Sequence, residues 1–271
     1  MGAERVRSVR SLGQRSVRDR QGLFLAEGPQ AVREAVRWRP DLVRDLYVTD
    51  EAAQRYADIV AAATAADLNV QLVTGDVLAA MADAQTPQGL LAVCRIPVAD
   101  LDEVLAAGPR VVGVLAHVRD PGNAGTVIRC ADASGADGVV LAGHSVDPYN
   151  DKTVRATVGS LWHLPLTLHD DPADVVRRAQ ADGFVVLAAD GAGDTDLFEA
   201  EDGGLLDGPV AWLFGNEAWG LTAEDRALAD EIVRVPLHGR AESLNLAMAA
   251  TVCLYASARH RTGSADRASG P

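Results

Sequence analysis

Phe214-Gly-Asn-Glu-Ala-Trp-Gly220 is the stretch that says most about the fold, because glycines and polar side chains directly follow the apolar run 210–214. Such a run predicts a buried strand, and the glycines after it predict a loop whose backbone a ligand can approach. Two distant segments have the same character. They are Asn123-Ala-Gly-Thr-Val-Ile-Arg129 and Val235-Pro-Leu-His-Gly-Arg-Ala-Glu-Ser-Leu-Asn245. Polar groups in such loops are more typical of a site than of a core.

Apolar runs alternate with helix-like segments throughout the second half of the chain. Strands are predicted at 111–115, 138–141, 164–168, 184–189, 210–214 and 232–235, and helices at 127–134, 151–160, 172–182, 222–229 and 243–260. Near-continuous apolar strands between helices indicate a mostly parallel sheet that is covered on both faces. Ligands of such sheets bind at the carboxyl ends of the strands, where all three segments fall. We therefore expect folding to bring the three segments together.

A series of shorter elements precedes this sheet. Strands are predicted at 23–27, 46–49, 70–73 and 90–96, with helices after Gly28 and at 52–67 and 75–83. This alternation indicates a small α/β domain. The stretch between Pro97 and Pro109 is polar and alanine-rich, which predicts a linker. The predicted organisation is an N-terminal domain over 1–97, a linker over 98–109, a second domain over 110–261 and a disordered tail over 262–271.

Charge is distributed unevenly along the 271 residues. A formal net charge of −13 argues against general binding to nucleic acids. Residues 1–40, however, hold nine arginines against four acidic residues, so contact with a polyanion is expected to begin near the N-terminus. A solvated arginine-rich end fits the same composition. No apolar run approaches the ~20 residues that span a membrane. The N-terminus lacks the apolar core of a secretory signal, so a cytoplasmic protein is expected.

Several common kinds of site are not indicated. Cys94, Cys130 and Cys253 lie far apart without metal-ligand spacing, which predicts buried free thiols. The six histidines show no His-x-x-x-His pairing, so no metal site is expected. The run 111–115 is not followed by the Gly-x-Gly-x-x-Gly fingerprint of dinucleotide sites, and the Walker A and Gly-x-Ser-x-Gly motifs are missing.

The polar residues of the three segments also have structural explanations. Asn123 follows the turn residues Pro121 and Gly122 and is placed to cap a helix. Arg129 lies in an apolar part of that helix, where it could pair with a carboxylate such as Glu217 or hold a phosphate bidentately. Ser243, at a predicted helix start, could be an N-cap. The residues by themselves leave the structural and the functional explanations open.

Taken together and in order, the segments resemble the three signature motifs of the SpoU/TrmH family of RNA ribose 2′-O-methyltransferases. The matching residues are Asn123, Gly125 and Arg129 in the first motif, Phe214, Gly215, Glu217 and Gly220 in the second, and Pro236, Gly239, Ser243, Leu244 and Asn245 in the third. Segments 24–28 and 86–93 resemble the family's N-terminal substrate-binding domain, and 147–155 resembles the stretch after the second strand of its catalytic domain. The resemblance covers about residues 22–258.

The resemblance implies an α/β fold: a C-terminal parallel-sheet domain of the SPOUT type with a deep trefoil knot, and a small L30e-like N-terminal domain that binds the RNA substrate. It implies S-adenosyl-L-methionine as cofactor and a homodimer in which the partner subunit completes each site. It implies catalytic roles for Asn123, Arg129, Glu217, Ser243 and Asn245, and cofactor contacts at Ala189, Gly215, Val235, Leu237 and Leu244. RNA contacts are expected at Arg10, Arg15, Arg18, Lys152 and Arg155, with no metal and no membrane contact.

These expectations describe 2′-O-methylation of a ribose in structured RNA. The N-terminal domain favours 23S ribosomal RNA, because ribosomal members of the family often carry one. The alternatives are a tRNA 2′-O-methyltransferase and a non-catalytic RNA-binding module of the same fold. The family proposal makes Arg129 the base that removes the hydroxyl proton. A free guanidinium keeps its proton at ordinary pH, so an orienting role is equally compatible. Housekeeping modification and self-protection against an antibiotic both fit the resemblance.

Overall fold

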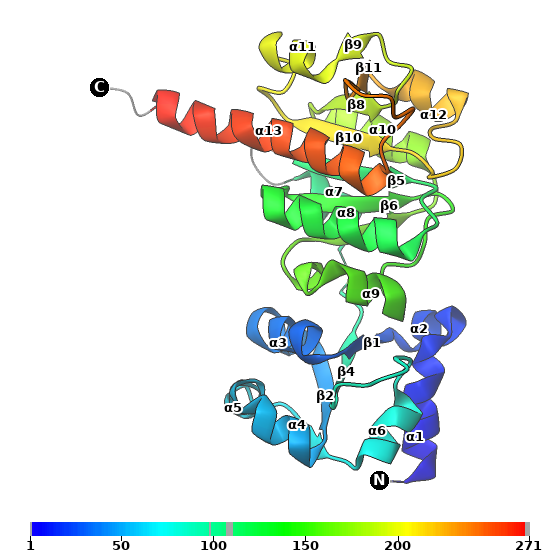
Figure 1. The fold of residues 1–271 in the computed structure, drawn as a ribbon, viewed down its shortest axis with the longest axis vertical. Coiled ribbons are helices and arrows are strands. Elements are labelled where there is room, and N and C mark those ends of the chain that lie inside the picture. The colour runs from blue at the N-terminus through cyan, green and yellow to red at the C-terminus, as the bar shows by residue number, and fades with distance from the viewer. Residues whose placement is uncertain (1, 98, 107–110, 269–271) are drawn as a thin grey trace. The chain divides into compact units, whose positions relative to one another are not determined.

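A computed structural model describes residues 2–97, 99–106 and 111–268, with side chains described up to residue 260 (Figure 1). The chain forms two compact units. Unit 1 contains residues 1–97 and 147–163, and unit 2 contains residues 98–146 and 164–271. Within the described ranges, no helix combines the length and the apolar character needed to cross a membrane.

Unit 2 is built on a seven-stranded sheet with the strand order β7-β6-β5-β10-β8-β11-β9. Every neighbouring pair in it is parallel. The strands are β5 (Val111–Ala116), β6 (Gly138–Ala142), β7 (Leu166–His169), β8 (Val185–Ala189), β9 (Thr195–Asp196), β10 (Val210–Phe214) and β11 (Glu231–Arg234). The central strands β5, β6 and β10 are buried along their whole length. The predicted parallel sheet is confirmed, and the sequence missed only the short β9.

Helices cover both faces of this sheet. They are α7 (Leu101–Leu105), α8 (Pro121–Ser134), α10 (Pro172–Ala181), α11 (Leu197–Asp202), α12 (Ala223–Leu228) and α13 (Leu246–Ala268). α7 and α10 pack in one core with Ala211 and Leu213 of β10. Trp212 between them points to the opposite face, because side chains alternate along a strand. Its indole N–H donates to Ser257 Oγ of α13 over 2.9 Å. α13 runs beside α8 on that face (Figure 1).

Two segments of unit 2 differ from the sequence prediction. Part of the predicted linker is α7, whose side chains Leu101, Val104 and Leu105 are buried. Asp100 caps this helix by accepting from Glu103 N over 2.7 Å. Linker positions 98 and 107–109 lie outside the described residues. α13 continues to Ala268 through most of the predicted tail, and 269–271 lie outside the described residues.

Unit 1 contains a four-stranded sheet with the order β1-β4-β2-β3, in which only the β2–β3 pair is parallel. Its elements are α1 (Ala3–Arg10), α2 (Arg15–Gln21), β1 (Leu23–Glu27), α3 (Pro29–Trp38), β2 (Val43–Val48), α4 (Asp50–Arg55), α5 (Ala57–Ala65), β3 (Val70–Leu72), α6 (Gly75–Met81), β4 (Leu90–Arg95) and α9 (Asp151–Thr157). Val9, Leu12 and Val17 are buried in one core with residues of β1 and β4. The arginine-rich N-terminus is therefore packed on the sheet.

Residues 147–163 group with unit 1, although the sequence places them in the second domain. Aromatic contacts explain the grouping. The ring of Phe24 lies 5.0 Å from that of Tyr149 and 5.5 Å from that of Trp162, measured between centroids. Trp162 Nε1 also donates to the carbonyl of Ala31 over 3.1 Å. These buried contacts join positions more than a hundred residues apart, so the local pattern of the sequence did not indicate them.

Candidate functional site

A cavity of about 320 Å³ lies in unit 2, where the carboxyl ends of β8, β10 and β11 meet the loops that follow them. These three strands are neighbours in the sheet, which is why loops distant in sequence converge. The cavity is lined by Ala189, Gly215, Val235, Leu237 and Leu244, which were predicted to contact a cofactor, and by Glu217 and Ser243 of the predicted catalytic set. The strand-end rule thus located the cavity.

The loop after β10 has one tightly determined conformation. A Cβ on Gly215 would lie 2.3 Å from backbone atoms of Gly220 and Leu221, so no larger residue fits there. Asn216 and Gly220 exchange two backbone hydrogen bonds of 2.9 Å each. The side chain of Asn216 donates to the carbonyl of His117 over 2.7 Å and accepts from Ala218 N over 2.8 Å. The loop is therefore held to the end of β5.

Hydrogen bonds join the three motif segments directly. Glu217 Oε1 accepts from the backbone N of Asp120 over 3.1 Å and from Asn123 Nδ2 over 3.4 Å. Glu217 Oε2 accepts from the backbone N of Arg119 over 3.3 Å. On its other side, Asn123 Oδ1 accepts from Asn245 Nδ2 over 3.0 Å. Asn123 therefore bridges the second and third segments, and the sequence predicted all three side chains without their pairing.

The structure does not confirm the structural explanations for Asn123 and Ser243, because neither side chain caps a helix. Asp120 caps α8 by accepting from Asn123 N over 2.7 Å, so Asn123 is not the cap. At the start of α13, Asn245 Oδ1 accepts from Ala247 N over 2.9 Å, and Ser243 forms no hydrogen bond with a described residue. The carboxylate of Glu217 is occupied by backbone and amide donors and does not pair with Arg129.

Arg129 stands apart from the other four predicted catalytic residues. It is exposed on α8, and its guanidinium forms no ion pair or hydrogen bond with any described residue. Of the two alternatives for Arg129, an ion pair with Glu217 is therefore wrong, while a guanidinium open to an anion stays a prediction. An unpaired guanidinium presents donors in the planar arrangement that suits a phosphate.

The loop between β11 and α13 offers a free backbone to the cavity. None of the backbone N–H groups of residues 237–244 donates to a described residue. Such groups need a partner, either water or a ligand. Leu237 and Leu244, 40% and 39% exposed, add apolar surface beside them. The cavity combines apolar walls with convergent polar groups, the usual character of a small-molecule site.

Asp190 and Gly191 were not singled out by the sequence analysis. Asp190 and Gly191 line the cavity directly after β8. The rule applied to the other strands was the available signal, because both residues follow the apolar run 184–189. Asp190 Oδ1 accepts from Ala192 N over 2.9 Å, which fixes the turn. Among the described residues, no group of three or more His, Cys, Asp or Glu side chains is placed to hold a metal ion.

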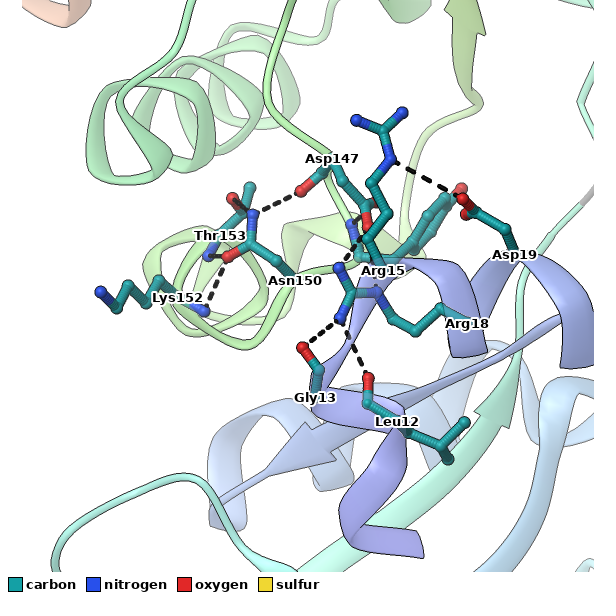
Figure 2. A network of polar contacts seen from close by, with 10 residues as sticks. Leu12, Gly13, Arg15, Arg18, Asp19, Asp147, Asn150, Lys152 and Thr153 are labelled. Atoms are coloured by element: carbon teal, nitrogen blue, oxygen red, sulfur yellow. Dashed lines mark hydrogen bonds and ion pairs between the residues drawn. The ribbon is translucent and has the colours of Figure 1, made fainter. Parts of the chain in front are cut away.

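Arg18, one of the predicted RNA contacts, is buried in unit 1. Its guanidinium donates to Asp147 Oδ2 from Nε over 2.9 Å and to the carbonyls of Leu12 and Gly13 (Figure 2). The residue is only 3% exposed, so Arg18 is not available to RNA, and the structure corrects this prediction. Arg10, Arg15 and Lys152 are exposed. They remain candidates for contact with RNA.

Arg155 is surrounded by carboxylates. Its guanidinium lies 2.8 Å from Asp151, 3.6 Å from Asp83 and 3.8 Å from Glu27. A hydrogen bond with Asp151 raises the pKa of Asp83, as expected where negative charges crowd together. Glu27 and Arg155 also line a cavity of about 300 Å³ in unit 1. Three carboxylates around one guanidinium disfavour a phosphate at this position, which argues against the predicted role of Arg155.

Comparison with known proteins agrees with this site. The model of the SpoU rRNA methylase family matches residues 110–255, and that of an MRM3-like substrate-binding domain matches residues 3–92. The chain is 32% identical over 255 residues to the 23S rRNA (guanosine(2553)-2′-O)-methyltransferase RlmP of Bacillus subtilis, covering 93% of this chain and 95% of RlmP. It is 33% identical to a 23S rRNA (uridine(2479)-2′-O)-methyltransferase of Streptomyces viridochromogenes, covering 92% of this chain and 87% of the relative.

A solved structure shows the same likeness in three dimensions. The SpoU methyltransferase AviRb from Streptomyces viridochromogenes, in complex with the cofactor AdoMet, superposes with a TM-score of 0.83 at 32% identity. The match covers 97% of this chain and all of AviRb. Family model, relatives and structure agree over both units, and the chain belongs to the SpoU rRNA methylase family.

Proposed function

We propose that this protein transfers a methyl group from S-adenosylmethionine to a ribose 2′-hydroxyl in structured RNA, with 23S ribosomal RNA as the substrate. The observation that carries the proposal is the hydrogen-bonded series Asn245–Asn123–Glu217 beside a cavity whose size and lining suit a small-molecule cofactor. The relatives act on 23S rRNA, and the substrate-binding unit found in this chain supports ribosomal RNA over tRNA.

The cavity residues fit the cofactor. Gly215, Val235, Leu237 and Leu244 would hold it, with Ala189 at the end of β8. Free N–H groups of the 237–244 loop suit its polar atoms, and the two leucines suit its apolar parts. Bound there, S-adenosylmethionine would supply a methyl group on a positively charged sulfur, which is already a good leaving group.

The side chains of the protein would then mainly align the reacting hydroxyl. Asn123 is fixed from both sides by Glu217 and Asn245, which leaves its amide little freedom to rotate. We assign Arg129 the role of binding RNA phosphate or orienting the hydroxyl, because a guanidinium does not give up its proton at ordinary pH. The free hydroxyl of Ser243 at the cavity is a further candidate for contact with the substrate.

We also propose a homodimer. Met248, Val252 and Tyr255 are 55%, 38% and 50% exposed and follow one another at helical spacing along α13. Three exposed large apolar side chains on one helical stripe are unusual for a surface that faces only water. A second copy of the chain would cover this stripe and place its own residues near α8, the neighbour of α13 that carries Arg129.

The remaining finer expectations stay proposals. We propose that the part of residues 110–261 that belongs to unit 2 forms the catalytic domain. We further propose that its chain is knotted in the loops around Gly215 and residues 235–245, and that residues 1–97 bind RNA. A ribosomal substrate also supports the cytoplasmic location predicted above.

Calorimetry with S-adenosylmethionine on the full-length protein, followed by methyl transfer to 23S rRNA from cells that lack the enzyme, tests the function. Arg129→Ala should abolish transfer and leave the cofactor affinity unchanged. Arg177→Ala is the matched control, because Arg177 is exposed on α10 and its surface ion pairs contribute little to stability. It should keep full activity. A folded protein that binds no S-adenosylmethionine would exclude the enzyme function.

A further inference from the structure

Trp219 is a large aromatic side chain exposed beside the cavity. Trp219 is 52% exposed, whereas Trp212 on the preceding strand is fully buried. Its neighbours Ala218 and Gly220 line the cavity, while Trp219 itself is outside it. The guanidinium carbon of Arg119 lies 5.2 Å from the centre of the Trp219 ring. An arginine and a tryptophan therefore form a cationic, aromatic surface at the rim of the cavity.

The backbone that carries both side chains of this surface is held in place before any ligand binds. Trp219 belongs to the loop closed by the two backbone hydrogen bonds between Asn216 and Gly220. The backbone N of Arg119 donates to Glu217 Oε2 over 3.3 Å, so one carboxylate ties both partners of the stack to the Asn123 network. A preorganised surface loses little conformational entropy when a ligand stacks on it.

Arg119 also lacks the usual partner of a surface arginine. Apart from the Trp219 ring, no described residue forms an ion pair, hydrogen bond or ring contact with its guanidinium. In a chain with a net charge of −13, a free arginine beside the cavity provides local attraction for an anion. The ring offers stacking area and the guanidinium offers charge, which together match a nucleotide better than an apolar peptide.

We propose that Arg119 and Trp219 form a stacking platform for an unpaired nucleobase next to the ribose that is methylated. The inference rests on the proposed function and adds a substrate contact to it. Proteins recognise RNA mostly at unpaired nucleotides, whose bases stack on aromatic rings and on guanidinium planes. Trp219 thus positions the RNA through its base, while Arg119 contributes both stacking and attraction to the phosphate backbone.

The test compares Trp219→Ala, Trp219→Phe and Arg119→Gln in the full-length protein. Losing one base stack lowers RNA affinity about 5- to 150-fold. Trp219→Ala should therefore raise the KM for 23S rRNA far more than it lowers kcat, and Trp219→Phe should restore most of the loss. Arg119→Gln should reduce the dependence of RNA affinity on salt by about one charge, and Trp219→Ala should leave that dependence unchanged.

Binding of a short oligoadenylate, followed by tryptophan fluorescence, gives a direct readout of stacking. Oligoadenylate should quench the tryptophan fluorescence of the wild-type protein. Trp219→Phe should lose most of this quenching while it still binds the oligoadenylate. Phe198→Ala is the matched control, because Phe198 is 51% exposed in the same unit. It should behave as wild type.

The inference is overturned if Trp219→Ala methylates 23S rRNA with an unchanged KM. It is equally overturned if this variant loses S-adenosylmethionine binding or dissociates the dimer, since Trp219 would then support the loop or the subunit interface. A wild-type protein that binds the cofactor but methylates no 23S rRNA would instead count against the proposed function.

Discussion

Replacing Arg18 by methionine should lower the free energy of unfolding of unit 1 by about 3–5 kcal/mol, the usual cost of removing one partner from a buried ion pair. The side chains of Arg18 and Asp147 are only 4% and 7% exposed. The guanidinium donates twice to Asp147 Oδ2 and once each to the carbonyls of Leu12 and Gly13, the latter two over 2.9 Å (Figure 2). Methionine fills similar space but leaves one carboxylate and two carbonyls without their donor.

The magnitude follows from these contacts. Two opposite unit charges about 4 Å apart attract by about 4 kcal/mol at the effective dielectric of ~20 that suits protein sites. Each carbonyl that loses its hydrogen bond adds about 1 kcal/mol. Water entering the site recovers part of this sum, which leaves about 3–5 kcal/mol. With a typical urea dependence of about 2 kcal/mol per molar, the midpoint of unfolding should fall by roughly 1.5–2.5 M.

Urea unfolding followed by circular dichroism and tryptophan fluorescence measures this change. Arg15→Met is the matched control, because Arg15 lies on the same helix with 60% of its side chain exposed, and its pair with Asp19 spans 3.8 Å. Its effect should stay below about 0.5 kcal/mol. Arg18→Met/Asp147→Asn should recover much of the loss, since asparagine removes the stranded charge and keeps the oxygen that accepts from Tyr149 N. An unchanged midpoint in Arg18→Met, with weakened RNA binding, would refute the reasoning.

Three further predictions concern the site of unit 2 and the thiols. Gly215→Ala should abolish cofactor binding measured by calorimetry, because its Cβ would lie 2.3 Å from backbone atoms of the same loop; cofactor binding at wild-type strength would contradict this. Glu217→Gln should slow single-turnover methyl transfer about 10- to 100-fold. The variant replaces one of the two oxygens that accept from backbone N–H groups by an amide NH₂, and a hydrogen bond to a charged group contributes about 1.5–3 kcal/mol. A thiol reagent at pH 8 should label only Cys130 in the folded protein, because Cys94 and Cys253 are buried and burial raises the pKa of the Cys253 thiol to about 12. Labelling of all three thiols without unfolding would contradict this, because it would show that the chain around Cys94 and Cys253 opens readily.

Local features of the sequence were enough to identify the parallel sheet of unit 2 and the position of its cavity. The apolar runs that became β5, β6, β8 and β10 are continuous because both faces of these strands are covered. Glycines and polar residues directly after such runs mark ligand sites because the carboxyl ends of parallel strands share one edge. These are properties of a short window of chain, so no knowledge of distant contacts was needed.

The partners of each side chain were decided only by the tertiary structure. Arg129 of α8 and Arg18 of α2 are both helical arginines, yet Arg129 is exposed without a partner among the described residues and Arg18 is buried against Asp147. Their local sequences suggest the opposite, because Arg129 follows the apolar Val127 and Ile128 whereas Arg18 stands among charged residues. The position of β10 between β5 and β8 brings Glu217 to Asn123, and the start of α13 brings Asn245 to the same amide. The sequence by itself determined which groups are present at strand ends, because polarity and backbone preference are local. Which of these groups come into contact depends on strand order and long-range packing, because these are set only when the chain folds.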